Sequence, residues 1–261
     1  MSSQPPSTLT DELQSDYKVA VVNTFKDLKE DEQGFLAFCY HEDILRNPGN
    51  FLSLLERTGQ ISWTDVGSLK EFLRAIRKER LARTLEKYET RRNVALLLDT
   101  FARKRQGLTQ MQSYLPKYIE DVAGYLAKIA DGVLDKTTVE SLSKLRKNLR
   151  DLMNDLETEI DDKLSNAWSK LALLIVIVGD IIAKPETGNE DYDPKPEVLK
   201  YFVGEICSRM ARQGTMEEFC HYVEKQFNDV FAEHDSNGNT ISSQQIVSDV
   251  IDQYTQTAFF Q

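Results

Sequence analysis

Residues 51–85, FLSLLERTGQISWTDVGSLKEFLRAIRKERLARTL, decide the fold. Two groups of apolar residues recur here at spacings of three and four, and Gly59 stands between them as the expected C-cap of the first helix. The segment Ser62-Trp63-Thr64-Asp65 has the form of a capping box with Asp in the last position, so we expect the second helix to begin there. The stretch therefore predicts two short helices and the start of a third.

The neighbouring segments extend this helical pattern in both directions. An apolar stripe predicts one earlier helix from about residue 10, with its buried face made by Leu13, Tyr17, Val21, Val22, Phe25 and Leu28. The acidic residues 30–32 mark the start of a second helix, because carboxylates there complement the helix dipole. Leu81, Leu85 and Tyr88 predict the sixth helix of the bundle, and residues 91–106 predict one more. Short loops join these helices, which favours a compact antiparallel bundle.

Three segments carry the pattern of a known family. They are FLAFC at 35–39 before an acidic 42–44, FLSLLERTGQI at 51–61, and LKEFLRAIR at 69–77, which continues through Leu81 to EKYE at 86–89. With this order and spacing, residues 17–90 resemble a death effector domain, a six-helix member of the death-fold superfamily. The resemblance implies homotypic or heterotypic assembly in apoptotic or innate-immune signalling.

The resemblance also implies a surface charge triad, made by an acid on the second helix and an Arg-x-Asp-Leu at the start of the sixth. In this sequence the acid falls at Asp31, beside Glu32. The later motif reads Lys78-Glu79-Arg80-Leu81, so Arg80 stands where the family has Asp. A shift of one residue gives an Arg-x-acid pair that begins at Arg77. The implied interaction surface consists of Asp31, Glu32, Phe38, Arg77, Lys78, Glu79 and Arg80, with Phe38 as an exposed apolar contact.

Basic residues are concentrated in the second half of this region. Residues 70–92 contain nine Lys and Arg against four Glu, an excess of five, in a chain whose net charge is −10. The run is either an ordinary solvated helix face or a docking surface for an acidic partner, such as residues 30–32 of another copy. The overall acidity argues against nucleic acid as a partner.

We place a flexible tail at residues 1–9, a first domain at 10–106 and a second helical domain at 107–261. In the second domain, a stripe from Ile119 to Val133 predicts an amphipathic helix, and a stripe over 142–171 predicts a long bundle helix or a coiled-coil seam. The apolar run 171–183 contains Asp180 and is shorter than the roughly 20 residues of a membrane span, so we expect a buried core helix. Membrane insertion after a conformational change is the alternative.

The sequence contains little that is typical of an enzyme. It has no P-loop, dinucleotide-binding glycine pattern or serine elbow. Cys220 and His221 are neighbours, and neighbouring side chains on a helix diverge, so they do not form a nucleophile–base pair. The three cysteines show no CxxC spacing, and no signal peptide is present, which indicates a reducing, cytoplasmic location. We expect neither catalysis nor a cofactor.

One loop resembles a calcium site near residues 233–245. Asp235, Asn237 and Asn239 supply oxygen ligands at alternate positions, and apolar segments on both sides suggest an EF-hand-like helix–loop–helix. The loop is one residue short at its glycine, and the terminal bidentate Glu is missing. It is therefore a non-binding relic, a simple Asn-Gly turn, or the basis of the alternative function, a calcium-responsive regulator.

Together these patterns predict an all-α protein, in which a six-helix death-fold-like antiparallel bundle precedes a second helical bundle domain. The predicted function is that of a non-enzymatic cytoplasmic adaptor or regulator, whose partners are other death-fold proteins or a second copy. The identity of the partner, the pro- or anti-apoptotic direction and the oligomeric state stay open.

Overall fold

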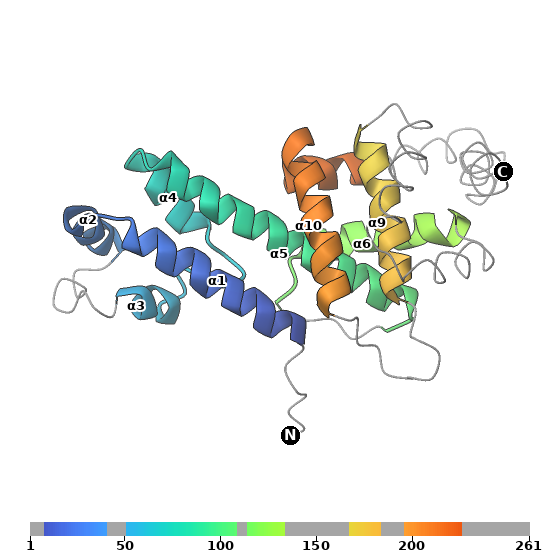
Figure 1. The fold of residues 1–261 in the computed structure, drawn as a ribbon, viewed down its shortest axis with the longest axis horizontal. Coiled ribbons are helices and arrows are strands. Elements are labelled where there is room, and N and C mark those ends of the chain that lie inside the picture. Colours follow the sequence, from blue (N-terminus) through green and yellow to red (C-terminus); the bar gives the residue numbers. More distant parts are fainter. Residues whose placement is uncertain (1–7, 41–50, 109–113, 134–166, 184–195, 226–261) are drawn as a thin grey trace, which may run out of the picture. The chain divides into compact units, whose positions relative to one another are not determined.

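A computed structural model of the chain describes residues 8–40, 51–108, 114–133, 167–183 and 196–225 (Figure 1). These residues contain helices and no β-strand, which confirms the all-α prediction. The helices are α1 (Thr8–Lys26), α2 (Glu30–Tyr40), α3 (Phe51–Arg57), α4 (Gly67–Ala75), α5 (Glu79–Arg105), α6 (Lys117–Val133), α9 (Ala167–Ala183) and α10 (Pro196–Gln213). Residues 216–225 form a further helical segment.

The chain divides into two compact units, Met1–Arg92 and Asn93–Gln261. This division falls inside α5, whereas the sequence places the domain boundary after residue 106. The expected separate helix over residues 91–106 is wrong, because α5 is one continuous helix of 27 residues. Residues 41–50, between α2 and α3, lie outside the described ranges, so the expected count of six helices in the first domain stays a prediction.

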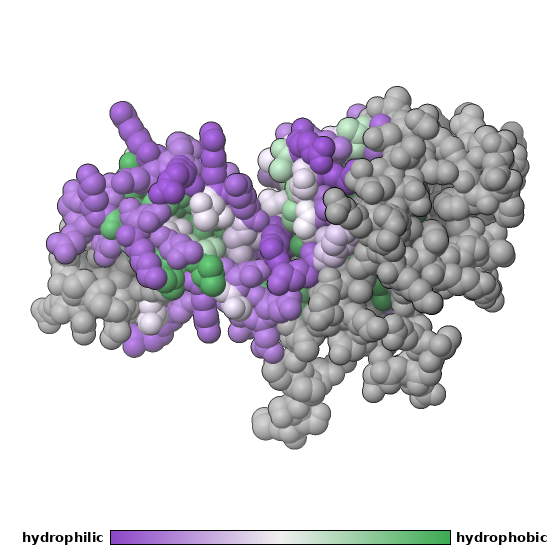
Figure 2. Space-filling view, in the orientation of Figure 1, coloured by the Kyte–Doolittle hydropathy of each residue, from purple (hydrophilic) through white to green (hydrophobic). Residues whose placement is uncertain are grey.

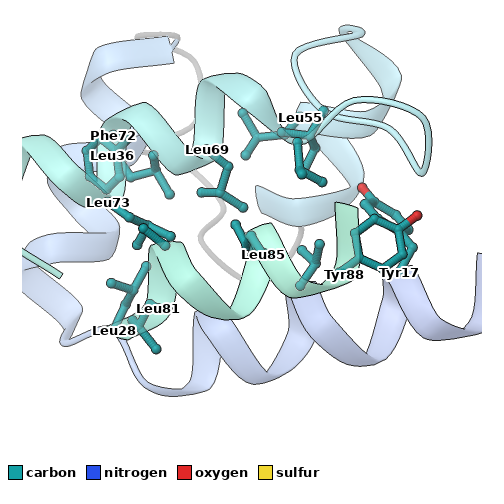
Figure 3. Packing of buried hydrophobic residues seen from close by; sticks show 14 residues of the cluster. Tyr17, Leu28, Leu36, Leu55, Leu69, Phe72, Leu73, Leu81, Leu85 and Tyr88 are labelled. Atoms are coloured by element: carbon teal, nitrogen blue, oxygen red, sulfur yellow. The ribbon is translucent and has the colours of Figure 1, made fainter. Parts of the chain in front are cut away.

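The first unit is held together by an apolar core that α1, α4 and α5 share with single residues of α2 and α3. Figure 3 shows Leu69 and Leu73 of α4 pointing toward Leu81 and Leu85 of α5. The rings of Tyr17 and Tyr88 close one end of the core, with centroids 5.9 Å apart. Burying one large apolar side chain contributes about 1.5–3 kcal/mol to the free energy of folding. Burial of the apolar stripes of α1 and α5 against each other therefore accounts for the alignment of the two helices.

Val22 departs from the predicted buried stripe of α1. It is 37% exposed, and Val19 on the same outer face is 58% exposed, while Leu13 and Val21 are buried. A helix turns by about 100° per residue, so Val22 cannot share the inward face of its neighbour Val21. Helix α1 also begins at Thr8 rather than near Thr10.

The expected helix ends are found in part. Gly59 has φ +72° and follows α3, where the Gln60 N–H donates to the Leu55 carbonyl over 2.9 Å, which confirms the predicted C-cap. The predicted capping box does not begin α4, because this helix starts at Gly67. Asp65 instead accepts from the Gly67 N–H, over 2.8 Å.

In the second unit, α9 packs against both α6 and α10. Its residues from Leu174 to Val178 are buried, which confirms the predicted core helix. The one buried carboxylate of α9, Asp180, receives a hydrogen bond from Arg105 Nε over 2.8 Å. Within the described ranges, no helix is long and apolar enough to cross a membrane.

Candidate interaction surface

The first turn of α2 carries three consecutive acids, Glu30, Asp31 and Glu32. Glu32 Oε2 accepts a hydrogen bond from the Lys29 N–H over 2.9 Å, so one carboxylate satisfies a backbone donor at the helix start. Asp31 and Glu30 are exposed. The helix dipole favours negative charge at this position, so the acidic turn stabilises the helix that presents it.

The α4–α5 junction turns on Arg77, the expected Arg of the shifted motif. Its φ is +61°, in the left-handed region. The Arg77 N–H donates to the Arg74 carbonyl over 2.9 Å, and the Lys78 N–H donates to the Leu73 carbonyl over 2.7 Å. This is the hydrogen-bond pattern that usually ends a helix at a glycine. The exposed Arg77 therefore occupies a backbone position that disfavours a residue with a Cβ atom.

Two ion pairs connect this α4–α5 junction to the region where α1 ends and α2 begins. Lys78 Nζ lies 2.8 Å from Glu32 Oε1 at the start of α2. Arg80 Nη2 lies 2.8 Å from Asp27 Oδ2, just after α1. The hydrogen bond from Lys78, followed by that from the Lys29 N–H, lowers the pKa of the Glu32 carboxyl below its usual range. The α1–α2 junction and the α4–α5 junction are thus adjacent in space.

The structure separates the predicted interaction residues into two groups. Glu32, Lys78 and Arg80 form ion pairs within the chain, and the Arg80 side chain is nevertheless 82% exposed. Asp31, Arg77 and Glu79 are exposed and form no ion pair with any residue in the described part of the chain. Phe38 lies on α2, and its side chain is outside the described residues.

Sequence reasoning missed Phe35 as an exposed residue of this surface. Its side chain is 52% exposed, although its ring centroid lies 6.0 Å from that of Phe72. The available signal was its spacing, since Phe35 follows Asp31 by four residues and so lies on the same helix face. An apolar ring beside the acidic turn adds hydrophobic area to a charged surface.

The basic run over residues 70–92 is largely neutralised within the chain. Lys70 pairs with Glu89 and Arg74 with Glu86, and Arg91 Nε lies 3.1 Å from Asp16 Oδ2. The cations of this run without an ion pair to any described residue are Arg77, Arg83 and Lys87. On the face drawn in Figure 2, the described residues of the first unit are mainly hydrophilic, with hydrophobic areas among them. The interpretation of residues 70–92 as a docking surface for an acidic partner therefore rests on these three cations rather than on the full excess of five positive charges.

The other candidate sites find little support in the structure. Cys220 is buried, and this burial, together with Glu217 and Glu224, raises the pKa of its thiol to about 12. His221 beside it is exposed. In the basic run 103–105, Arg103 and Arg105 pair with Asp99 and Asp180. Within the described part of the chain, no group of three or more His, Cys, Asp or Glu can hold a metal ion.

The predicted calcium loop, with Asp235, Asn237 and Asn239, lies outside the described residues. The stripe over residues 142–171 lies largely outside them as well.

In comparisons with known proteins, no family model, no curated protein and no solved structure matches this chain.

Proposed function

We propose that the chain is a non-enzymatic adaptor or regulator, which acts by death-fold-like protein–protein interaction in apoptotic or innate-immune signalling. The ion pair between Glu32 and Lys78 is the observation that carries the proposal. It joins the start of α2 to the α4–α5 junction, and so brings the neighbouring residues Asp31 and Arg77 to one surface. Both stay exposed and available to a partner.

The resemblance to death effector domains supports the same proposal. The family pattern has an acid on the second helix and a cation at the first position of the later motif, and Glu32 and Lys78 are residues of these two kinds in contact. The third position departs from the pattern, because Arg80 replaces the family's Asp and pairs with Asp27. The contact between the start of α2 and the α4–α5 junction thus fits the family pattern, while the charge at position 80 is opposite to that of the family.

Opposite exposed charges on one surface can complement the same surface of a second copy or of another death-fold protein. Such complementarity determines specificity and encounter rate more than raw affinity. The exposed Asp31 and Arg77 differ in this respect from Arg80, which is already paired within the chain.

Charge reversal tests the proposal in the full chain. We expect Asp31→Arg and Arg77→Glu each to weaken self-association by about tenfold, since each removes an attraction and adds a repulsion. An equimolar mixture of the two variants should regain association, because the arginine introduced at position 31 of one variant then meets the glutamate introduced at position 77 of the other. Sedimentation velocity over a concentration series measures this.

Glu71→Lys on the exposed outer face of α4 is the matched control for Asp31→Arg, because it changes net charge by the same amount in the same direction and lies outside the described ion pairs. If both single variants fold and associate like the wild type, Asp31 and Arg77 are not interface residues and the proposal fails.

A further inference from the structure

The outer face of α1 carries a regular stripe that the core of the first unit does not use. Its members recur at spacings of three, four, three and four, and all are exposed: Glu12, Ser15, Val19, Val22 and Lys26. This is the heptad spacing of residues that face a second helix. Val19 is 58% exposed and Val22 is 37% exposed, which makes the centre of the stripe apolar.

The position of α1 leaves this stripe uncovered by the described residues of its unit. Leu13, Tyr17 and Val21 face the core. On the flank toward α5, the ion pairs Asp16–Arg91 and Asp27–Arg80 lie along the antiparallel pair of helices. The stripe lies on neither of these faces, since a helix of 3.6 residues per turn places it opposite the core.

The charges at the two ends of the stripe are of opposite sign. Glu12 lies near the start of α1, and Lys26 is its last residue. Neither side chain forms an ion pair with any residue that the structure describes. The sequence along the stripe is therefore acid, small polar, apolar, apolar, base.

We infer that this stripe pairs with the α1 stripe of a second copy, in an antiparallel, two-fold symmetric dimer. An antiparallel arrangement packs Val19 of each copy against Val22 of the other. In this register Lys26 of each copy lies level with Ser15 of the other, three residues or about 4.5 Å along the axis from Glu12. The long side chains of Lys26 and Glu12 span this offset, so both end contacts are attractive. A parallel arrangement would place Glu12 against Glu12 and Lys26 against Lys26, and these like charges disfavour it.

A symmetric contact of this kind uses one self-complementary patch on both copies. It goes beyond the proposed function and does not depend on it, because Asp31 and Arg77 take no part in the stripe. Two valines from each copy give a small apolar centre, so the dimer is of the weak, transient class.

Charge exchange between positions 12 and 26 tests the dimer in the full chain. Sedimentation equilibrium over about 10 μM to 1 mM covers the range expected for a weak contact. Glu12→Lys and Lys26→Glu should each weaken dimerisation by about tenfold, since each places like charges at both ends of the symmetric pair. The double variant E12K/K26E should return to the wild-type dissociation constant.

Mixing the two single variants gives the most specific measurement. One variant then carries a lysine at both ends of its stripe, and the other carries a glutamate at both ends. Every end contact of a mixed pair is attractive, so the mixture should form heterodimers although neither variant dimerises well alone. Val19→Ser should weaken both the wild-type and the mixed dimer. Circular dichroism melting curves establish that each variant is folded.

Glu71→Lys and Lys200→Glu, two exposed positions outside α1, are the charge-matched controls and should leave dimerisation unchanged. A wild-type chain that stays monomeric throughout the range overturns the inference. It is also overturned if the chain dimerises but neither the double variant nor the mixture regains association. Because the exchanged charges are at positions 12 and 26, the test separates this dimer from association through Asp31 and Arg77.

Discussion

At the scale of single residues, three helix ends share one hydrogen-bond pattern but not one residue type. After α3, α4 and α5, the residue at the turn has φ of +72° (Gly59), +61° (Arg77) and +73° (Gly107). In each case the following N–H donates to the carbonyl five residues earlier. Glycine adopts this conformation without steric cost, whereas an L-residue with a side chain loses about 1–2 kcal/mol. Arg77 therefore stays in place at a cost to stability.

We expect Arg77→Gly to stabilise the first unit while it weakens association. Relief of the left-handed strain exceeds the extra backbone entropy that glycine loses on folding, so the net gain should be about 0.5 kcal/mol. Urea unfolding measures stability, and sedimentation measures association in the same samples. Arg77→Ala is the control, since it removes the guanidinium but keeps the strain, and it should weaken association without the gain in stability. A loss of stability in the glycine variant would contradict this account of the junction.

The same comparison shows what the sequence could predict about the site. Gly59 was predictable as a helix end because glycine is the residue that usually adopts this conformation. Arg77 carries no such local signal, because arginine is not a residue that usually ends a helix. Its turn lies beside two long-range ion pairs, Lys78–Glu32 and Arg80–Asp27, which the local sequence does not indicate. The sequence predicts the charged residues of the candidate surface, whereas their division into residues with and without an ion pair to a described residue required the tertiary structure.

At the scale of secondary structure elements, α9 depends on one close approach to α5. A Cβ atom at Gly179 would lie 2.2 Å from Phe101 Cδ1 and 2.6 Å from Cε1. Phe101 is fully buried, so its ring has little room to move away. The glycine thus allows the ring of α5 to pack directly on the backbone of α9.

We expect Gly179→Ala to destabilise the protein by about 1–3 kcal/mol, because the added methyl group overpacks a buried contact. Gly204→Ala on α10 is the matched control, since nothing lies within 4 Å of its Cβ position. In that open helical position alanine should stabilise by about 0.5–1 kcal/mol. Urea unfolding followed by far-UV circular dichroism compares the two variants. Equal effects of the two substitutions would show that the approach of Phe101 is not a constraint.

The helices themselves were largely predictable, and the continuity of α5 was not. The apolar stripes predicted α1, α4, α6 and α9 because each has one face, or most of its surface, buried. Residues 91–93 are polar, and a separate helix was expected from residue 91. Polar groups there are buried instead, and Arg92 donates to the Trp63 carbonyl over 3.2 Å while Asn93 donates to Tyr118 Oη over 2.9 Å. Such long-range partners permit polar residues inside a buried helix, and no local pattern indicates them.

At the scale of the whole molecule, the position of the domain boundary has a testable consequence. The apolar core of the first unit ends with Tyr88. The apolar residues of α5 beyond Arg92 are nearly fully buried and belong to the second unit: Val94, Ala95, Leu96, Leu97, Leu98, Phe101 and Ala102. A fragment that contains them without the rest of that unit exposes their side chains to water.

We therefore expect fragment 1–92 to fold as a soluble domain and fragment 1–106 to associate non-specifically. Each large apolar side chain left exposed in the longer fragment loses about 1.5–3 kcal/mol of burial, and the exposed residues form one continuous helix surface. Light scattering at a few micromolar, below the concentrations of the weak dimer, and binding of a hydrophobic dye should both be higher for fragment 1–106. Fragment 1–106 with Leu97→Glu and Phe101→Glu is the control, and it should recover solubility because charge replaces two of the exposed apolar groups. If the shorter fragment fails to fold while the longer one is monomeric and melts cooperatively, the boundary lies after residue 106, and the residues beyond Arg92 stabilise the first unit.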